Sequence, residues 1–269
     1  MATRPSVNPS LDPAMFAPGP ARDARFTVVE RWVDCVNLPE GHDEKTIEFL
    51  HRQMNEEIDG LETTARSLLD YPDVEWDIRM RLARQCSDEA RHVLMFRRLF
   101  EKRGGQVGQY PVMNFQYRII TKVDSLPGRL AVQNRSFEAE GIDAIEPAIA
   151  EASSHGDDEL ATLFEFQLAD EIGHVRFAND YISQMARKDP RSVMQVGRAL
   201  NYASQAFAQV MGQEAIDGVK YGVNAQGRLE AGFRPEEVEF LASGRAKMAG
   251  QRASDSASKE PESREDSSS

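Results

Sequence analysis

A pattern of acidic and histidine residues that occurs twice constrains the fold of this chain more than any other feature. The segment Glu57-Ile-Asp-Gly-Leu-Glu62 matches Glu138-Ala-Glu-Gly-Ile-Asp143 position by position. Further along, Asp88-Glu-Ala-Arg-His92 matches Asp170-Glu-Ile-Gly-His174, at almost the same separation from the first segment. One structural unit therefore occurs twice, each time with a glutamate that is followed by a Glu-x-x-His motif.

Both copies lie in sequence with helical periodicity, because apolar residues recur there every three or four positions. Ile47, Leu50 and Met54 begin one such series. Proline cannot continue a helix and glycine often follows its last turn, so Pro72 and the pair Gly104-Gly105 mark two helix ends. The predicted helices cover residues 43–70, 74–102, 127–152, 157–187 and 191–219.

These helices predict an all-α fold, since little of the remaining sequence is typical of strands. The first two helices form one hairpin and the next two form a second hairpin. A long non-periodic crossover between hairpins is one of the known four-helix-bundle topologies. The fifth predicted helix is an additional C-terminal one.

Composition at both ends predicts a folded domain over residues 21–242. Residues 1–20 are proline-rich, and residues 243–269 are rich in serine and charge, so neither segment can bury much apolar surface. We therefore expect both segments to be disordered. Residues 25–37 are rich in β-branched side chains and fit either a strand or a short helix.

The composition also excludes several classes of protein. The net charge of −12 argues against general binding to nucleic acid, because an acidic surface repels phosphate. Only two cysteines are present, Cys35 and Cys86, which excludes a disulfide scaffold and fits a cytoplasmic location. Neither an apolar run of membrane-spanning length nor an ordinary secretory signal is visible.

The Glu-x-x-His motifs are expected to face the core of the bundle. Glu89 lies three residues after Cys86 and four before Val93, within an apolar series. Glu171 has the same spacing from Leu168 and Val175, and residues three apart share a helix face. A buried carboxylate without a partner costs several kcal/mol, so carboxylates gathered in one interior imply bound cations.

Four glutamates and two histidines form the ligand set of the dinuclear carboxylate proteins with ferritin-like folds. The chain resembles the ferritin-like superfamily over about residues 43–187, and more narrowly a poorly characterised bacterial branch of it. The matching motifs are Glu57–Glu62 with Tyr71-Pro72, Asp88–His92, Gly108-Gln-Tyr-Pro-Val112 and Phe137-Glu-Ala139. Gln109 departs from that pattern, in which aspartate is expected.

The resemblance implies a role for each residue of the repeated pattern. Glu57 and Glu138 would be terminal carboxylates, Glu89 and Glu171 would bridge or chelate, and His92 and His174 would each bind one metal ion. Asp88 and Asp170 would each orient the histidine of the opposite hairpin. Arg91 matches an arginine near the metals in oxygen-activating relatives, although the second copy has Gly173 instead.

The resemblance also implies the function that we expect, a dinuclear non-haem iron oxidase or monooxygenase. Such an oxidoreductase uses two Fe ions, or an Fe/Mn or Mn pair, to activate O₂ and oxidise a small organic substrate. Electrons would come from a separate reductase or ferredoxin, because the chain has no nucleotide-binding glycine motif. A homodimer is compatible with this function, whereas nucleic acid and membrane partners are not expected.

Two alternatives share the same ligands. One is iron handling as a ferroxidase, and the other is hydroxylation of tRNA, for which Arg97, Arg98, Lys102 and Arg103 offer a local basic patch. A non-catalytic helical protein with a vestigial site is a further alternative.

Several other residues of the sequence allow a structural or a functional interpretation. Gly60 and Gly141 either leave space beside the metals or allow close helix packing, and Pro147 is expected to kink its helix. His42, His51 and His155 are expected on the surface. The acids next to the first glutamate of each copy are expected to form a solvated edge; they are Asp59, Glu62, Glu140 and Asp143.

Overall fold

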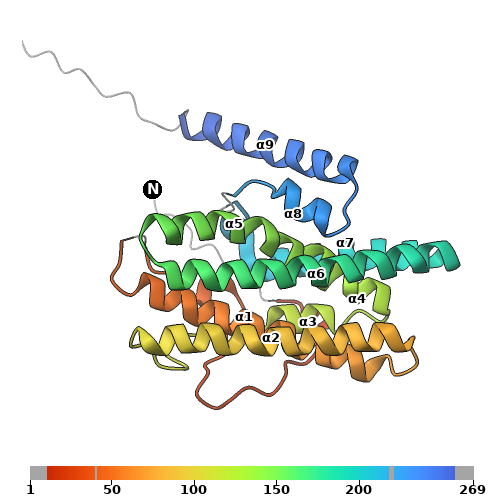
Figure 1. Cartoon of the computed structure of the whole chain (residues 1–269), viewed down its shortest axis with the longest axis horizontal. Helices are drawn as coiled ribbons and strands as arrows, with labels where there is room; N and C mark the ends of the chain where they lie inside the picture. The colour runs from red at the N-terminus through yellow and green to blue at the C-terminus, as the bar shows by residue number, and fades with distance from the viewer. Residues whose placement is uncertain (1–10, 40, 218–220, 258–269) are drawn as a thin grey trace, which may run out of the picture.

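The computed structural model describes residues 11–39, 41–217 and 221–257, and this part of the chain is all-helical. Helices α1 (Lys45–Asp70) and α2 (Trp76–Lys102) form the first hairpin, with extensive contact between them. The chain leaves α1 at Tyr71-Pro72 and α2 at Gly104, as the sequence predicts. The two helices lie antiparallel in Figure 1.

The second hairpin pairs a composite helical segment with α6 (Asp158–Lys188). Its first arm runs without interruption from α4 (Leu126–Val132) through a π-helical turn, η3 (Gln133–Glu138), into α5 (Ala139–Ser154). The predicted third helix is therefore confirmed, but its middle is wound more loosely than expected. Pro147 lies inside α5. Helix α6 contacts α2 of the first hairpin, which brings the two Glu-x-x-His motifs together.

Further helices join and cover the two hairpins. The crossover contains α3 (Phe115–Ile120), and α7 (Arg191–Asp217) follows α6 and packs on α3 and α4. Residue 219, the predicted end of the fifth helix, lies outside the described residues. Helices α8 (Ala225–Glu230) and α9 (Pro235–Ala257) lie over the α5–α6 side of the molecule (Figure 1). Among the described helices, none is long and apolar enough to cross a membrane.

The prediction that both chain ends are disordered is wrong for the parts that the structure describes. Leu11 and Phe16 are buried in a core cluster together with Ile119 and Ile120, and a 3₁₀ turn, η1, forms at Pro13–Met15. At the other end, α9 continues through residues 243–257. Composition fails for residues 11–20 because two apolar side chains, Leu11 and Phe16, anchor this otherwise proline-rich segment to the core. Residues 1–10 and 258–269 lie outside the described residues.

Residues 25–37 form neither a regular strand nor an α-helix. They contain a single parallel bridge between Val28 and Val112 of the crossover, followed by a 3₁₀ turn, η2 (Trp32–Asp34). Gly108 lies so close to this segment that a Cβ there would stand 2.2 Å from the carbonyl oxygen of Arg25. Residues 25–37, which the sequence left open between a strand and a short helix, are thus positioned by backbone pairing with the crossover.

The acids predicted to form a solvated edge instead bind arginines from the two ends of the chain. Arg22 reaches Asp59 at 2.9 Å and Glu62 at 3.0 Å, with Asp59 buried. In the second hairpin, Asp143 is buried and binds Arg228 at 2.6 Å. The periodicity alone could not reveal this, because each arginine is distant from its acid in the sequence.

Arg245 of α9 adds a second contact on the same edge. It reaches Asp143 at 2.8 Å and also pairs with Glu140. The terminal segments are therefore held by ion pairs at equivalent places on the two hairpins.

His51 is buried rather than on the surface, contrary to the sequence-based expectation. Its Nε2 accepts a hydrogen bond from the backbone N–H of Gly108 at 3.0 Å, which attaches the crossover to α1. The rings of Phe26, Phe100 and Tyr110 surround it at centroid distances of 5.8, 5.3 and 5.7 Å. Burial lowers the pKa of His51 to about 4.

This burial predicts a loss of stability in acid. The pKa of His51 is about 4 in the folded chain and 6.5 ordinarily, so the unfolded chain takes up the proton first as the pH falls. Between pH 6.5 and 4 the free energy of unfolding should fall by up to about 1.4 kcal/mol per pH unit from this group. Urea unfolding at several pH values should show a smaller slope over this window for His51→Gln. If the free energy of unfolding changes equally with pH in both proteins, the lowered pKa of His51 is wrong.

Candidate metal centre

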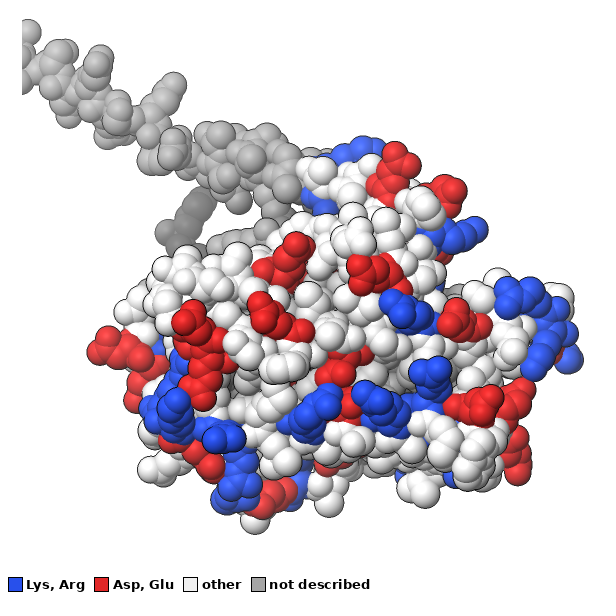
Figure 2. Space-filling model, viewed as in Figure 1, with Lys and Arg blue, Asp and Glu red and all other residues white. Residues whose placement is uncertain are grey.

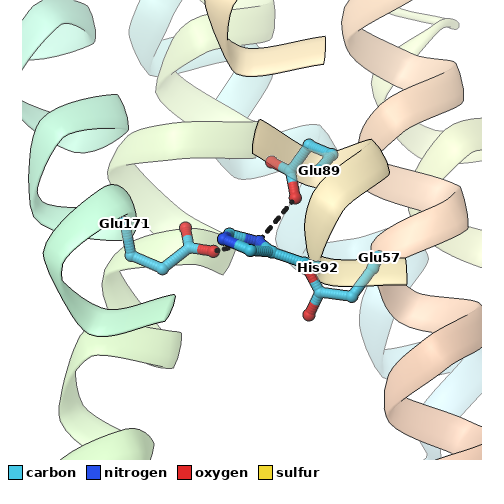
Figure 3. Close-up of side chains that lie close together, drawn as sticks. All are labelled: Glu57, Glu89, His92 and Glu171. Carbon is cyan, nitrogen blue, oxygen red and sulfur yellow. Dashed lines mark hydrogen bonds and ion pairs between the residues drawn. The ribbon is translucent and has the colours of Figure 1, made fainter. Parts of the chain in front are cut away.

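The six predicted ligands converge in the interior between the two hairpins. Glu57 comes from α1, Glu89 and His92 from α2, Glu138 from η3, and Glu171 and His174 from α6. Glu138 is partly buried and the other five are buried. Figure 3 shows Glu57, Glu89 and Glu171 around the imidazole of His92.

The ligand atoms form two neighbouring groups. Atoms from Glu57, Glu89, His92 and Glu171 lie within 4.8 Å of one another, and so do atoms from Glu89, Glu138 and His174. Glu89 belongs to both groups. The two oxygens of Glu171 also face different histidines, with Oε1 3.9 Å from Nδ1 of His92 and Oε2 3.7 Å from Nδ1 of His174. The buried cluster thus has the ligands to hold metal ions.

Each imidazole is oriented by an aspartate of the opposite hairpin. Nε2 of His92 lies 3.0 Å from Asp170, and Nε2 of His174 lies 3.3 Å from Asp88. An aspartate that accepts the Nε2 proton fixes the tautomer that leaves Nδ1 free to bind a metal. The roles that the resemblance implies for these two aspartates therefore agree with their positions.

Two atoms of the cluster indicate that a cation fits there. Nδ1 of His174 and Oε2 of Glu171 are buried without a hydrogen-bond partner. Unpaired buried polar atoms are uncommon in proteins and call for a physical explanation. These two atoms face each other at 3.7 Å, so one ion between them would satisfy both.

Burial and mutual repulsion shift the pKa values of most of the clustered carboxylates upward. Burial raises the pKa of Glu57, Glu138 and Glu171 above the ordinary value, and neighbouring carboxylates raise it further. The pKa of Glu89 is lowered, because its hydrogen bond to His92 and the charges of both histidines outweigh the effect of burial. The carboxylates therefore depend on cations close by.

Neighbouring carboxylates raise the pKa of the two histidines, against the effect of burial. Burial alone would lower the pKa of His92, but hydrogen bonds to Glu57 and Glu89 raise it to about 12. Burial would raise the pKa of Asp88, but hydrogen bonds from His174 and Arg84 lower it to about 2. Metal ions bound at Nδ1 would replace the protons on the imidazoles, since metal binding requires neutral histidine.

Arg91 links the two aspartates. It donates to Asp88 at 3.1 Å and also pairs with Asp170, so one guanidinium spans both hairpins. Arg84 adds a second bond to Asp88 at 2.9 Å. The position predicted for Arg91, behind the ligands, is therefore occupied by a residue that fixes both orienting carboxylates.

Sequence reasoning missed four amide side chains that surround the glutamates. Gln85 donates to Glu138, and Gln167 donates to Glu57 at 2.7 Å, again across the two hairpins. Each glutamine lies four residues before the second glutamate of its copy, so the repeat is in fact Gln-x-x-Asp-Glu-x-x-His. Extending the alignment of the two copies by three residues would have revealed both.

The other two amides come from the π-helical turn. Gln133 and Asn134 donate to Glu138 at 3.3 and 2.8 Å. A π-turn brings residues five apart onto one side of a helix, and such turns are frequent at functional sites. Nothing in the spacing of apolar residues indicated this local change of winding.

The two repeated glycines differ in their surroundings. A Cβ on Gly60 would stand 3.3 Å from the carboxylate carbon of Glu89 and 3.5 Å from both its oxygens. A Cβ on Gly141 would meet nothing within 4 Å. Gly60 therefore leaves room for the carboxylate shared by the two ligand groups, while Gly141 does not touch the cluster.

This difference makes a matched pair of substitutions informative. Both Gly60→Ala and Gly141→Ala should favour the helix by about 0.5–1 kcal/mol, because glycine is costly inside a helix. Only Gly60→Ala should also displace the carboxylate of Glu89 and weaken metal binding, by about tenfold as is common for groups beside a metal ligand. Equilibrium dialysis with Co²⁺ measures the affinity, and Gly141→Ala is the control. Equal affinities in the two variants would contradict the geometry.

Comparison with known proteins places the chain in a family. Residues 3–239 match the model of the family described as "Protein of unknown function (DUF455)", so the chain belongs to that family. An uncharacterized protein of Haemophilus influenzae is 26% identical over 113 residues, which span 42% of this chain and 36% of that protein. No solved structure matches.

Proposed function

We propose that this protein is a ferritin-like, dinuclear non-haem metal oxidase that uses O₂ to oxidise a small organic molecule. Two bound Fe ions would supply the capacity to bind and reduce O₂. The observation that carries the proposal is the pair of neighbouring ligand groups that share Glu89, each with its own histidine. A single structural ion would require only one of these groups.

The chain's own residues support this chemistry in three ways. The hairpins bury the ligands and keep bulk water from them. Asp88 and Asp170 keep Nδ1 of both histidines directed at the cluster. Arg91 pairs with both aspartates and positions them to accept the Nε2 protons of the two imidazoles.

The proposed reaction also requires a source of electrons. Reduction of O₂ to water takes four electrons, of which oxidation of the substrate would supply two. An external reductase or ferredoxin would supply the other two. Iron handling uses the same six ligands and remains a secondary proposal.

Acidic side chains partly neutralise the basic patch that suggested tRNA as a substrate. Arg97 pairs with Glu101, Lys102 with Glu159 and Arg103 with Asp157. Basic and acidic side chains are interspersed over the face shown in Figure 2. This arrangement favours a small molecule over a nucleic acid as the substrate.

Iron loading followed by exposure to air tests the proposal. The full chain, loaded with Fe²⁺ without oxygen, should bind two ions and then consume O₂ when it is admitted. Glu171→Gln should lose iron and O₂ uptake together, because Glu171 faces both histidines. Iron analysis and an oxygen electrode measure the two quantities.

Glu165→Gln is the control for this variant, since Glu165 lies on the same helix but is exposed. It should bind iron and consume O₂ like the unmodified protein. If the loaded protein consumes no O₂, or if Glu171→Gln consumes as much as Glu165→Gln, the proposed function is wrong.

A further inference from the structure

The two terminal glutamates are held differently, although they occupy equivalent places in the repeat. Glu57 accepts one side-chain amide bond, from Gln167 to its Oε1 at 2.7 Å. Its Oε2 lies 3.1 Å from Nδ1 of His92, an atom that would itself bind the metal. One oxygen of Glu57 is thus anchored, and the other is directed into the ligand group without a competing amide.

Glu138 accepts three side-chain amide bonds, and they occupy both of its oxygens. Gln85 and Gln133 donate to Oε1, and Asn134 donates to Oε2 at 2.8 Å. A metal ion at Glu138 must share its oxygen with an amide N–H or displace it. Hydrogen bonds to an ionised carboxylate are strong, and these three occupy lone pairs that a metal ion would otherwise use.

The cause of the difference is the π-helical turn. Gln133 and Asn134 belong to η3, whereas α1 is an uninterrupted α-helix from Lys45 to Asp70. In α1, Gln53 stands four residues before Glu57 as Asn134 does before Glu138, but it donates to Glu56 at 3.0 Å. The first copy therefore has no amide that competes at Glu57 Oε2.

The ligand groups differ in number in the same direction. The first group contains three carboxylates and His92, and the second contains two carboxylates and His174. Glu171 belongs to the first group and directs its other oxygen toward His174 at 3.7 Å. The closer grouping of three carboxylates and the smaller number of competing hydrogen bonds both favour a divalent cation at the first position.

We propose that the two positions bind metal in a fixed order and with unequal affinity. The position of Glu57, Glu89, His92 and Glu171 fills first, and the position of Glu89, Glu138 and His174 fills second. The amides of the π-turn weaken the second position. This inference rests on the proposed dinuclear centre, and it allows the two positions to hold different ions.

Titration of the metal-free full chain with Co²⁺ in the absence of oxygen tests this order. Calorimetry should resolve two steps of one ion each, with dissociation constants that differ by about tenfold or more, the usual size of effects from groups beside the ligands. Glu57→Gln should remove the tight step, and Glu138→Gln should remove only the weak one. A single step of two equal ions, or loss of the tight step in Glu138→Gln, would overturn the proposal.

Two amide variants keep the test independent of the ligands themselves. Asn134→Ala should tighten the second step and leave the first unchanged, because it frees Oε2 of Glu138. Gln167→Ala should weaken the first step and leave the second unchanged, because it releases the anchored oxygen of Glu57. Weakening of the second step by Asn134→Ala would show that this amide supports the ligand and would overturn the proposal.

The outcomes separate this proposal from the proposed function. Equal steps would refute the order alone, since an oxidase can hold two equivalent ions. Ordered binding without O₂ uptake would support the order and refute the oxidase. A chain that binds no Co²⁺ would refute both.

Discussion

Four carboxylates lie between two helical hairpins, and the rest of the structure depends on how their charge is compensated. Each ionised group that leaves water costs several kcal/mol unless a counter-charge lies close by. Two imidazoles and a ring of amide donors supply part of that compensation, and two polar atoms still have no partner. The cluster could hold metal ions that supply the remainder.

The same constraint explains how the hairpins hold together. Each second helix sends a glutamine to the terminal glutamate of the other hairpin and an aspartate to the other histidine. Each hairpin therefore helps to orient the ligands of the other, in addition to the bonds that Gln133 and Asn134 make to Glu138 within the second hairpin. Arg22, Arg228 and Arg245 then fasten the ends of the chain to acids beside the terminal glutamates. The polar network thus couples the position of the metal ligands to the packing of the whole domain.

Much of the fold and of the cluster could be predicted because both follow from local periodicity. Apolar spacing located α1, α2 and α6 to within a few residues, and the repeat identified the six side chains that converge in the interior, together with Asp88 and Asp170. The π-turn, the burial of His51 and the arginine contacts of Asp59 and Asp143 could not be predicted. Each depends on a partner that is distant in sequence, or on a change of winding that residue spacing does not encode.

We propose that the six side chains bind two ions between the hairpins. Crystals of the protein from iron-supplemented cells, measured on either side of the iron absorption edge, test it most directly. The account predicts two anomalous peaks near Glu89 and Glu171, one beside Nδ1 of His92 and the other beside Nδ1 of His174. Crystals that show no peak there, with these side chains directed away from a common centre, would contradict it.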